Sequence, residues 1–347
     1  MRNLLKTAMV AAIVLATCSP AQGQVNMVYV TVGDPGNFGE LSGAGAGGYG
    51  PDRICGAVGY TYKIGKYEVT NAQYRQFLNA KAAFGDPYGL YDLSMSNMWG
   101  GIDRTGAGAP GDPYVYTSKG GDSEWDVRPV NYVSWWDAVR FANWLTNGQG
   151  DGDTESGSYS IADGGPDSGT VTVPTAAERA AWTTPRVVLP SEDEWYKAAH
   201  YKGGGTDAGY WLYATQSETV PASEAPPGTD LVSGSANYHS GDYAVGAPYY
   251  TTPVGAYTGR PSDSAYGTFD QNGNVWEWTE AFDGSDPQLR GASFYMNEVW
   301  SLRASHRIFN NTWSSNIGFR VVEVPEPATL ALLAAGGLAL GRRKRSR

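Results

Sequence analysis

Glycine and proline recur at short intervals along the chain, and they limit how far any helix or strand can run before it is interrupted. The 347 residues include 46 glycines and 20 prolines, a content that favours turns and irregular connections. The chain also has 12 tryptophans and 23 tyrosines, which is more aromatic surface than disordered chains carry. These features predict a folded, loop-rich protein with few short helices and strands.

The acidic charge excludes one class of partner. The formal net charge is −10, from 25 basic and 35 acidic residues. Binding to nucleic acid needs clustered Lys and Arg against the phosphates, so we expect no nucleic acid partner. The charge otherwise favours solubility and identifies no ligand.

Residues 1–23 have the parts of a secretory signal peptide. Arg2 and Lys6 precede an apolar run, and small residues follow it, so we expect cleavage before Gln24. Cys18 follows a threonine, where a lipoprotein signal would carry glycine or alanine. The sequence therefore predicts export without a lipid anchor.

Cysteine and histidine offer little local evidence for a metal or redox site. Once the signal is removed Cys55 is the remaining cysteine, and its simplest role is a small buried side chain. The histidines, His200, His239 and His306, share no metal-ligand spacing, and no HExxH motif is present. His200 ends a predicted helix, where a cation would suit the helix dipole.

Residues 325–347 form a tripartite C-terminal segment. Pro-Glu-Pro is followed by an apolar run, residues 328–340, and then by the basic tail RRKRSR. The run is shorter than the roughly 20 residues that a membrane-spanning helix needs, and the basic tail would stay cytoplasmic. The segment resembles the PEP-CTERM sorting signal of Gram-negative bacteria, and a plain tail anchor is the alternative. The resemblance implies export, recognition by an exosortase, transient membrane association through residues 328–340, removal of the tail, and delivery to the cell surface, outer membrane or extracellular matrix.

Capping boxes mark the predicted helices. In each box the side chains of two residues three apart bond the free backbone N–H groups of the helix start, and an apolar face follows. The boxes are Thr70 with Gln73, Ser134 with Asp137, and Ser191 with Glu194. The segments VNMVYVTV and YKIGKYEV predict strands that precede the first helix.

The remaining mature chain is predicted to consist mainly of loops in one domain. Residues 85–127 and 203–268 show no clean period. Residues 148–185 are typical of an insertion, with a hairpin formed by YSIADGG and GTVTV. The acidic turn DGDTE in this insertion is either solvated or a cation site. Because no Pro- or Ser-rich linker divides residues 24–324, we expect a single domain.

The stretch FDQNGNVWEW, residues 269–278, is the strongest local candidate for a binding site. Its side chains supply hard oxygen ligands, and Gly273 permits a sharp bend, which are features of calcium loops. The oxygens belong to Asp270, Asn272, Asn274 and Glu277. The spacing is not that of an EF-hand. The alternative is a glycine turn into a strand whose tryptophans fill the core.

Several segments in one order carry a resemblance to a known family. They are YEVTNAQYRQFL, RPVNYVSWWDAVRFANWL, LPSEDEW, TPVGAY, YGTFDQNGNVWEW, LRGASF and IGFRVV. Over residues 57–324 the chain resembles the formylglycine-generating enzyme or sulfatase-modifying factor family, for which GNVWEW with the final GFR is a specific signature. The resemblance implies a C-type-lectin-like α+β fold with little regular structure. The family includes oxidases that make formylglycine on sulfatases and iron-dependent sulfoxide synthases.

The resemblance also implies calcium as a cofactor. The first implied site uses Asp270 and Glu277, with the carbonyl oxygens of Gly273 and Val275. A second site would use Asn237 and the carbonyl of Tyr238, and its other ligands have no clear counterpart here. Glu68 matches a further acid that contacts calcium in the family.

The catalytic pattern of the oxidases does not extend to this chain. Their copper is held by two cysteines shortly before the terminal GFR, whereas this chain has Val299 near the first position and Ala304 at the second. Neither side chain can replace a thiolate ligand, so we expect no copper and no catalytic residues. The sequence favours a non-catalytic binding or structural module, with a divergent oxidoreductase of the formylglycine-generating or non-haem iron family as the alternative.

Aromatic loops could supply the binding surface of such a module. The candidates for stacking against a glycan or peptide are Trp99, Trp125, Trp211 and Trp313. Packing in the core is the competing role for at least half of them.

Overall fold

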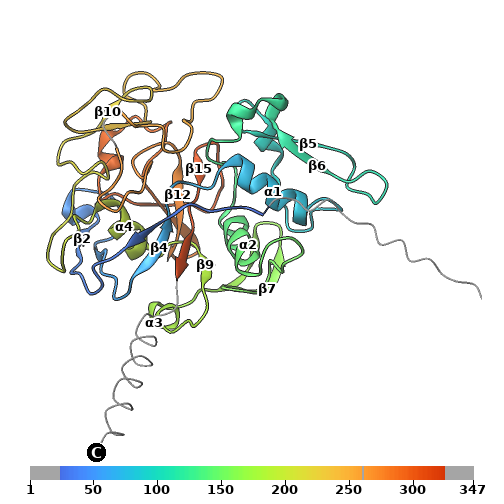
Figure 1. Cartoon of the computed structure of the whole chain (residues 1–347), viewed down its shortest axis with the longest axis horizontal. Coiled ribbons are helices and arrows are strands. Elements are labelled where there is room, and N and C mark those ends of the chain that lie inside the picture. Colours follow the sequence, from blue (N-terminus) through green and yellow to red (C-terminus); the bar gives the residue numbers. More distant parts are fainter. Residues whose placement is uncertain (1–23, 260–261, 325–347) are drawn as a thin grey trace, which may run out of the picture.

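The computed structural model describes residues 24–259 and 262–324, which are drawn in colour in Figure 1. The predicted signal peptide and the C-terminal sorting segment lie outside these ranges. In the part of the chain that the structure describes, no helix is long and apolar enough to cross a membrane.

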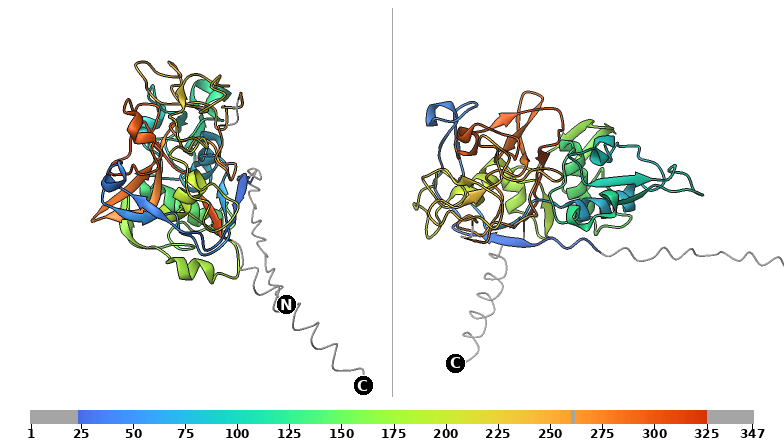
Figure 2. Two further views of the ribbon diagram at one scale, coloured as in Figure 1. Left: turned by 90° about the vertical axis from the view of Figure 1, so that its left-hand side faces the viewer. Right: turned by 90° about the horizontal axis from the view of Figure 1, so that it is seen from above.

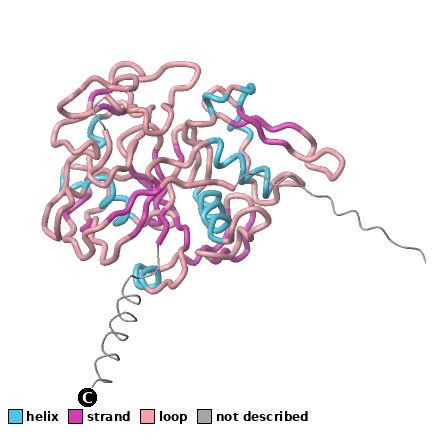
Figure 3. Tube along the Cα trace, in the orientation of Figure 1, coloured by secondary structure: helices cyan, strands magenta, loops and turns pink. Residues whose placement is uncertain are grey.

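The helices are short, and most of the described chain consists of loops (Figure 3). The α-helices are α1 (Asn71–Lys81), α2 (Trp135–Thr146), α3 (Ala176–Ala180) and α4 (Glu192–His200). The 3-10 helices are η1 (Ala44–Ala46), η2 (Leu93–Ser96), η3 (Lys119–Gly121), η4 (Ser123–Trp125) and η5 (Val299–Leu302). The capping boxes predicted for α1, α2 and α4 are confirmed, and Thr175 with Glu178 forms another at α3.

Two four-stranded sheets form the centre of the molecule. The first has the order β1 (Tyr29–Val32), β4 (Tyr62–Gly65), β16 (Val322–Val324) and β9 (Arg186–Val188), with every pair antiparallel. The second has the order β14 (Ile308–Phe309), β13 (Asp286–Arg290), β12 (Trp276–Asp283) and β15 (Ile317–Gly318). Strands β12 and β15 run parallel, so the GNVWEW segment lies beside the segment that leads to GFR.

Short two-stranded pairings complete the strand content. They are β2 (Glu40–Ser42) with β3 (Arg53–Cys55), β5 (Ile102–Thr105) with β6 (Val115–Ser118), β7 (Ser160–Gly165) with β8 (Ser168–Thr172), and β10 (Ala222–Ser223) with β11 (Ser235–Ala236). The hairpin predicted in the insertion is confirmed as β7–β8. The β5–β6 hairpin extends from one end of the molecule, and the loops around β10 gather at the other (Figures 1 and 2).

Three local expectations were wrong. Residues 85–127 contain the β5–β6 hairpin as well as loops, because its strands pair with each other across a Gly-rich turn. The acidic turn is not simply solvated, since Glu155 accepts a 2.8 Å hydrogen bond from the buried Nε of Arg140. His200 is not a helix-end cation, because burial and the nearby Arg290 lower its pKa to about 3.

The core explains how so loop-rich a chain stays ordered. Between α1 and α2, Phe77 and Phe141 pack edge to face with ring centroids 5.5 Å apart, and Phe319 packs on Phe141 at 5.4 Å. Trp276 and Trp278 of β12 are buried to 1% exposure, which confirms that these tryptophans fill the core.

Candidate functional site

The FDQNGNVWEW loop is built around a glycine that no other residue could replace without strain. Gly273 has φ of 92°, and a Cβ there would lie 2.3 Å from the carbonyl oxygen of Asn237. This close approach lets the N–H of Asn274 donate a 2.8 Å hydrogen bond to the Asn237 carbonyl. The loop is thereby held against the segment that contains Asn237.

The end of the loop is anchored by a buried ion pair. Both carboxylate oxygens of Glu277 accept hydrogen bonds from Arg320, from Nε and Nη2, each at 2.6 Å. Trp195 Nε1 donates a further 2.8 Å bond to Glu277, and Arg320 Nη2 donates to the carbonyl of Phe269 at 2.8 Å. The Arg of GFR thus ties the Glu of GNVWEW to the chain that enters the loop.

Two more buried carboxylates face the same guanidinium. Asp270 accepts a 2.6 Å bond from the N–H of Gly255, and Glu68 accepts a 3.0 Å bond from Nδ2 of Asn274. Burial, with the charges of Asp270 and Glu277, raises the pKa of Glu68 well above its usual range. Burial also raises the pKa of Asp270 to about 6. Three carboxyl groups therefore share one guanidinium in this cluster.

The neighbouring amide has an unused acceptor. Nδ2 of Asn237 donates to the Tyr250 carbonyl at 2.9 Å and to Oδ1 of Asn274 at 3.2 Å, whereas its Oδ1 is buried without a hydrogen-bond partner. An unsatisfied hard oxygen beside excess carboxylate is the kind of donor set that suits calcium. Within the described ranges, no three His, Cys, Asp or Glu side chains are grouped so as to hold a metal by themselves. Backbone or amide oxygens would have to complete the set.

Most of the predicted calcium residues are brought together, and the carbonyl of Tyr238 already has a hydrogen-bond partner. Glu68, Asn237, Gly273 and Val275 meet around Asn274, where the N–H of Val275 also donates to Glu68 at 3.4 Å. The carbonyl of Tyr238 accepts a 2.5 Å bond from the hydroxyl of Ser223.

The positions that correspond to the copper cysteines hold no thiol. Ala304 is buried beside Cys55 and three tyrosines, while Val299 is 41% exposed at the surface. Cys55 is fully buried, as expected, and burial raises the pKa of its thiol. A buried neutral thiol is a poor nucleophile and a poor metal ligand.

A group of rings in mutual contact is partly exposed around the buried Phe294, and we call it the aromatic surface. It consists of Trp99, His239, Tyr243, Tyr250, Phe294 and Tyr295. Trp99 is central, with ring centroids 4.2 Å from Tyr250 and 5.7 Å from Phe294. Tyr295 is 56% exposed. A cavity of about 350 Å³ opens beside it, lined by His239, Tyr243, Tyr295, Met296, Asn297 and Glu298.

Sequence reasoning found one member of the aromatic surface and missed the others. Trp99 belongs to it, but the tyrosines lie in loops without a period that could have revealed them. Trp125 is a core residue at 5% exposure. Trp211 lies under Lys202 at 4.4 Å, and Nε1 of Trp313 donates to Asp92 at 2.9 Å, so both are held by polar neighbours.

Together, the fold and the site define a loop-rich α+β domain in which a GNVWEW loop is locked to a terminal GFR. The family described as "Sulfatase-modifying factor enzyme 1-like domain" matches residues 53–324, and the chain belongs to this family. The PEP-CTERM protein-sorting motif matches residues 323–346, which marks an exported protein of the Gram-negative cell envelope or surface.

Two mammalian relatives bear the name "Inactive C-alpha-formylglycine-generating enzyme 2". The one from Bos taurus is 28% identical over 309 residues, covering 85% of this chain and 87% of its own length. The one from Mus musculus is 31% identical over 199 residues, covering 54% of this chain and 57% of its own. Among solved structures, CarF is 22% identical with a TM-score of 0.46, covering 87% of this chain and 99% of its own.

Proposed function

We propose that this protein is an exported binding module that keeps the family scaffold without the copper chemistry, and that its aromatic surface binds a glycan. The observation that carries the proposal is the aromatic surface itself, with exposed Tyr295 beside a cavity. Apolar faces of sugar rings pack on aromatic rings, while phenol, imidazole, amide and carboxylate groups bond to sugar hydroxyls. His239, Asn297 and Glu298 supply such polar groups in the lining.

The absence of a thiol at Val299 and Ala304 supports the non-catalytic part of the proposal. The buried Cys55 is one thiol rather than a pair, and the thiolate form that could bind copper is disfavoured there. The names of the two mammalian relatives are in keeping with a scaffold that has lost its activity. Recognition of residues 325–347 by an exosortase would deliver the module to the cell surface or the surrounding matrix.

Calcium belongs to the same proposal as a structural ion. Glu68, Asp270 and the orphaned Oδ1 of Asn237 would hold it, and its charge would offset the excess of carboxylates. Glu277, with the carbonyl oxygens of Gly273 and Val275, would line the same site. Binding to the native state alone would stabilise the fold by mass action.

The metal content of the purified chain tests both the calcium and the non-catalytic reading. We expect elemental mass spectrometry to find stoichiometric calcium and neither copper nor iron. Stoichiometric copper or iron would contradict the proposal and favour a divergent oxidoreductase. If no metal is found, the calcium part is wrong, and the cluster must hold one of its carboxylates protonated.

Binding at the aromatic surface is tested by one substitution with a matched control. Tyr295→Ala removes an exposed ring from the surface, whereas Tyr49→Ala removes a ring of similar exposure elsewhere, 58% against 56%. Affinity electrophoresis in gels that contain a soluble neutral β-glucan compares the two. A ring contact of about 0.5–1.5 kcal/mol predicts a roughly 2- to 12-fold loss of affinity for Tyr295→Ala and none for Tyr49→Ala. Equal retardation of both variants would count against the aromatic surface.

A further inference from the structure

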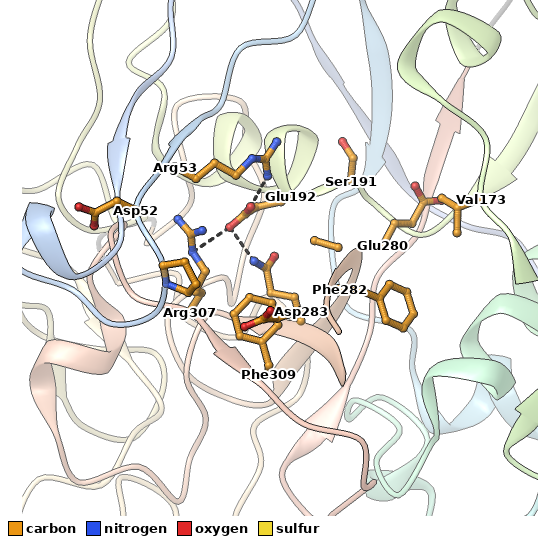
Figure 4. A pocket seen from close by; sticks show the side chains of 13 residues that line it. Asp52, Arg53, Val173, Ser191, Glu192, Glu280, Phe282, Asp283, Arg307 and Phe309 are labelled. Carbon is orange, nitrogen blue, oxygen red and sulfur yellow. Dashed lines mark hydrogen bonds and ion pairs between the residues drawn. The ribbon is translucent and has the colours of Figure 1, made fainter. Parts of the chain in front are cut away.

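A second cavity, of about 590 Å³, lies away from the aromatic surface and differs from it in chemistry (Figure 4). It is bounded by the start of β3, the N-terminal end of α4, the end of β12, and β14. Its size is that of a pocket for a small molecule or a sugar residue. Figure 4 shows Arg53 and Arg307 approaching Glu192 from two sides, with Phe282 across the pocket.

The charged residues of the lining are Arg53 and Arg307, which lie beside Glu192, together with Asp52, Glu280 and Asp283. Arg53, Arg290 and Arg307 all pair with Glu192, and Arg53 also pairs with Asp193 at 2.6 Å. Three guanidinium groups therefore share two carboxylates. Burial would raise the pKa of Glu192, but the guanidinium groups lower it to about 2, so it is fully ionised and already fully engaged.

Arg53 is the accessible arginine of this group, whereas Arg307 adds charge from a side chain that is 2% exposed. Nε of Arg307 is buried and lies 3.1 Å from Glu192 but makes no hydrogen bond of good geometry. Burial and the like charge of Arg290 lower the pKa of Arg307, as expected for a cation without enough counter-charge. The side chain of Arg53 is 42% exposed, so an incoming anion can reach it beside its pairs with Glu192 and Asp193. A carboxylate is the group that an accessible guanidinium binds best.

The rest of the pocket favours a sugar over an apolar acid. Phe282 is 40% exposed and Phe309 is half-buried, so ring faces are available for stacking. Asp52 and Asp283 add exposed oxygen acceptors at the rim, which suit several hydroxyl donors. A ligand with one carboxylate, several hydroxyls and an apolar face satisfies all of these surfaces.

We propose that this cavity, which we call the arginine pocket, binds a uronic acid residue of an acidic polysaccharide. Its carboxylate lies against Arg53 and Arg307, one face of the sugar ring packs on Phe282, and the sugar hydroxyls donate to Asp52 and Asp283. The proposal does not depend on the aromatic surface, because the two cavities share no lining residue.

Calorimetric titration of the full-length chain in detergent tests the proposal, with a galacturonic acid trimer as the probe. We expect the trimer to bind and its methyl ester, which lacks the charge, to bind at least tenfold more weakly. Arg53→Gln should weaken trimer binding about tenfold, as for loss of a charge-assisted hydrogen bond. Lys63→Gln is the matched control, because Lys63 has the same charge and 43% exposure but lies outside the pocket lining.

Two further variants distinguish binding in the arginine pocket from binding at the aromatic surface. Phe282→Ala should weaken binding of the trimer several-fold without changing the charge of the site. Tyr295→Ala should leave trimer binding unchanged, so a failure at the aromatic surface would not affect this result. The proposal is overturned if the wild-type chain does not bind the trimer, if acid and ester bind equally, or if Arg53→Gln and Lys63→Gln behave alike.

Discussion

At the scale of single residues, the Glu277–Arg320 pair stands out among the described ion pairs because neither side chain has any exposed surface. The bond joins positions 43 residues apart. A buried pair adds little net stability, but removal of one partner leaves the other charge without compensation. The pair therefore fixes the position of the GNVWEW segment relative to the GFR segment.

Substitution of one partner should be far more costly than loss of an exposed pair. We expect Arg320→Ala to lower the free energy of unfolding by about 3–5 kcal/mol, because Glu277 stays buried and unpaired. Lys63→Ala, which breaks a partly exposed pair with Glu323, should cost less than about 1 kcal/mol. Urea unfolding of both variants gives the comparison, and equal losses would show that Arg320 is not the organising residue.

Gly273 and Gly267 have similar φ angles but differ in the space around them. Substituting each by alanine therefore distinguishes the cost of backbone strain from the cost of steric crowding. Gly273 has φ of 92° and would place a Cβ 2.3 Å from backbone, whereas Gly267 has φ of 85° with its nearest neighbour at 3.7 Å. Gly267→Ala should cost about 1–2 kcal/mol from strain alone. Gly273→Ala adds overpacking and should cost about 1–3 kcal/mol more. Chemical denaturation measures both, and similar costs would mean that the FDQNGNVWEW loop can shift freely.

At the scale of elements, α4 links local capping to the buried charge network. Ser191 accepts from the N–H of Glu194, and the carboxylate of Glu194 accepts both from the N–H of Ser191, at 2.7 Å, and from Nη1 of Arg179, at 2.5 Å. The helix start is therefore fixed by a local box and by a contact from α3. Its first residue, Glu192, pairs with Arg53, Arg290 and Arg307 at the arginine pocket.

Loss of the N-terminal cap of α4 should weaken ligand binding in the arginine pocket as well as lower stability. Ser191→Ala removes one capping bond and should cost about 1 kcal/mol of stability. Because Ser191 and Glu192 both line the arginine pocket, the same variant should also weaken uronate binding there. Ser134→Ala at α2 is the control, with a similar loss in thermal unfolding and unchanged binding. A binding loss in both variants would indicate general destabilisation instead.

At the scale of the whole molecule, the first sheet joins the beginning of the domain to its end. Strand β4 pairs with β1 on one side and with β16 on the other, so β1 belongs to the domain although the family match starts at residue 53. The domain buries ionisable groups whose pKa values are shifted, Asp270 and His306 among them, so its stability should respond to pH.

His306 gives the clearest pH prediction. Burial and Arg290 lower its pKa to about 4, below the unfolded value of about 6.5. Between pH 6.5 and 4 the unfolded chain binds a proton at His306 that the native chain does not bind. The contribution of neutral His306 to stability is therefore fully present above pH 6.5, and it is lost as the pH falls to 4. The raised pKa of Asp270 increases stability as the pH falls over part of this window. Because wild type and His306→Gln both contain Asp270, its effect cancels in the difference between them.

The measurement is the difference in unfolding free energy between wild type and His306→Gln at several pH values. We expect this difference to fall by on the order of 3 kcal/mol between pH 6.5 and 4. A constant difference across the window would show that His306 titrates alike in both states.

The local chemistry of the sequence determined the helix starts, the buried tryptophans of β12, the loop-rich character and the family. Thr70, Ser134 and Ser191 accept hydrogen bonds from backbone N–H groups three residues away, so the partners of these bonds can be read from neighbouring positions in the sequence. Trp276 and Trp278 are large apolar side chains two positions apart in one strand, so they lie on the same face of the sheet and enter the core together.

Only the tertiary structure decided which distant loops meet. The ring of Trp99 packs on Phe294, Cys55 lies against Ala304, and Arg53 shares Glu192 with Arg307. These residues lie in segments without a regular period, so no spacing along the chain encodes their contacts. They are placed by the packing of the two sheets and the helices around one core, and the aromatic surface and the arginine pocket exist because that packing brings them together.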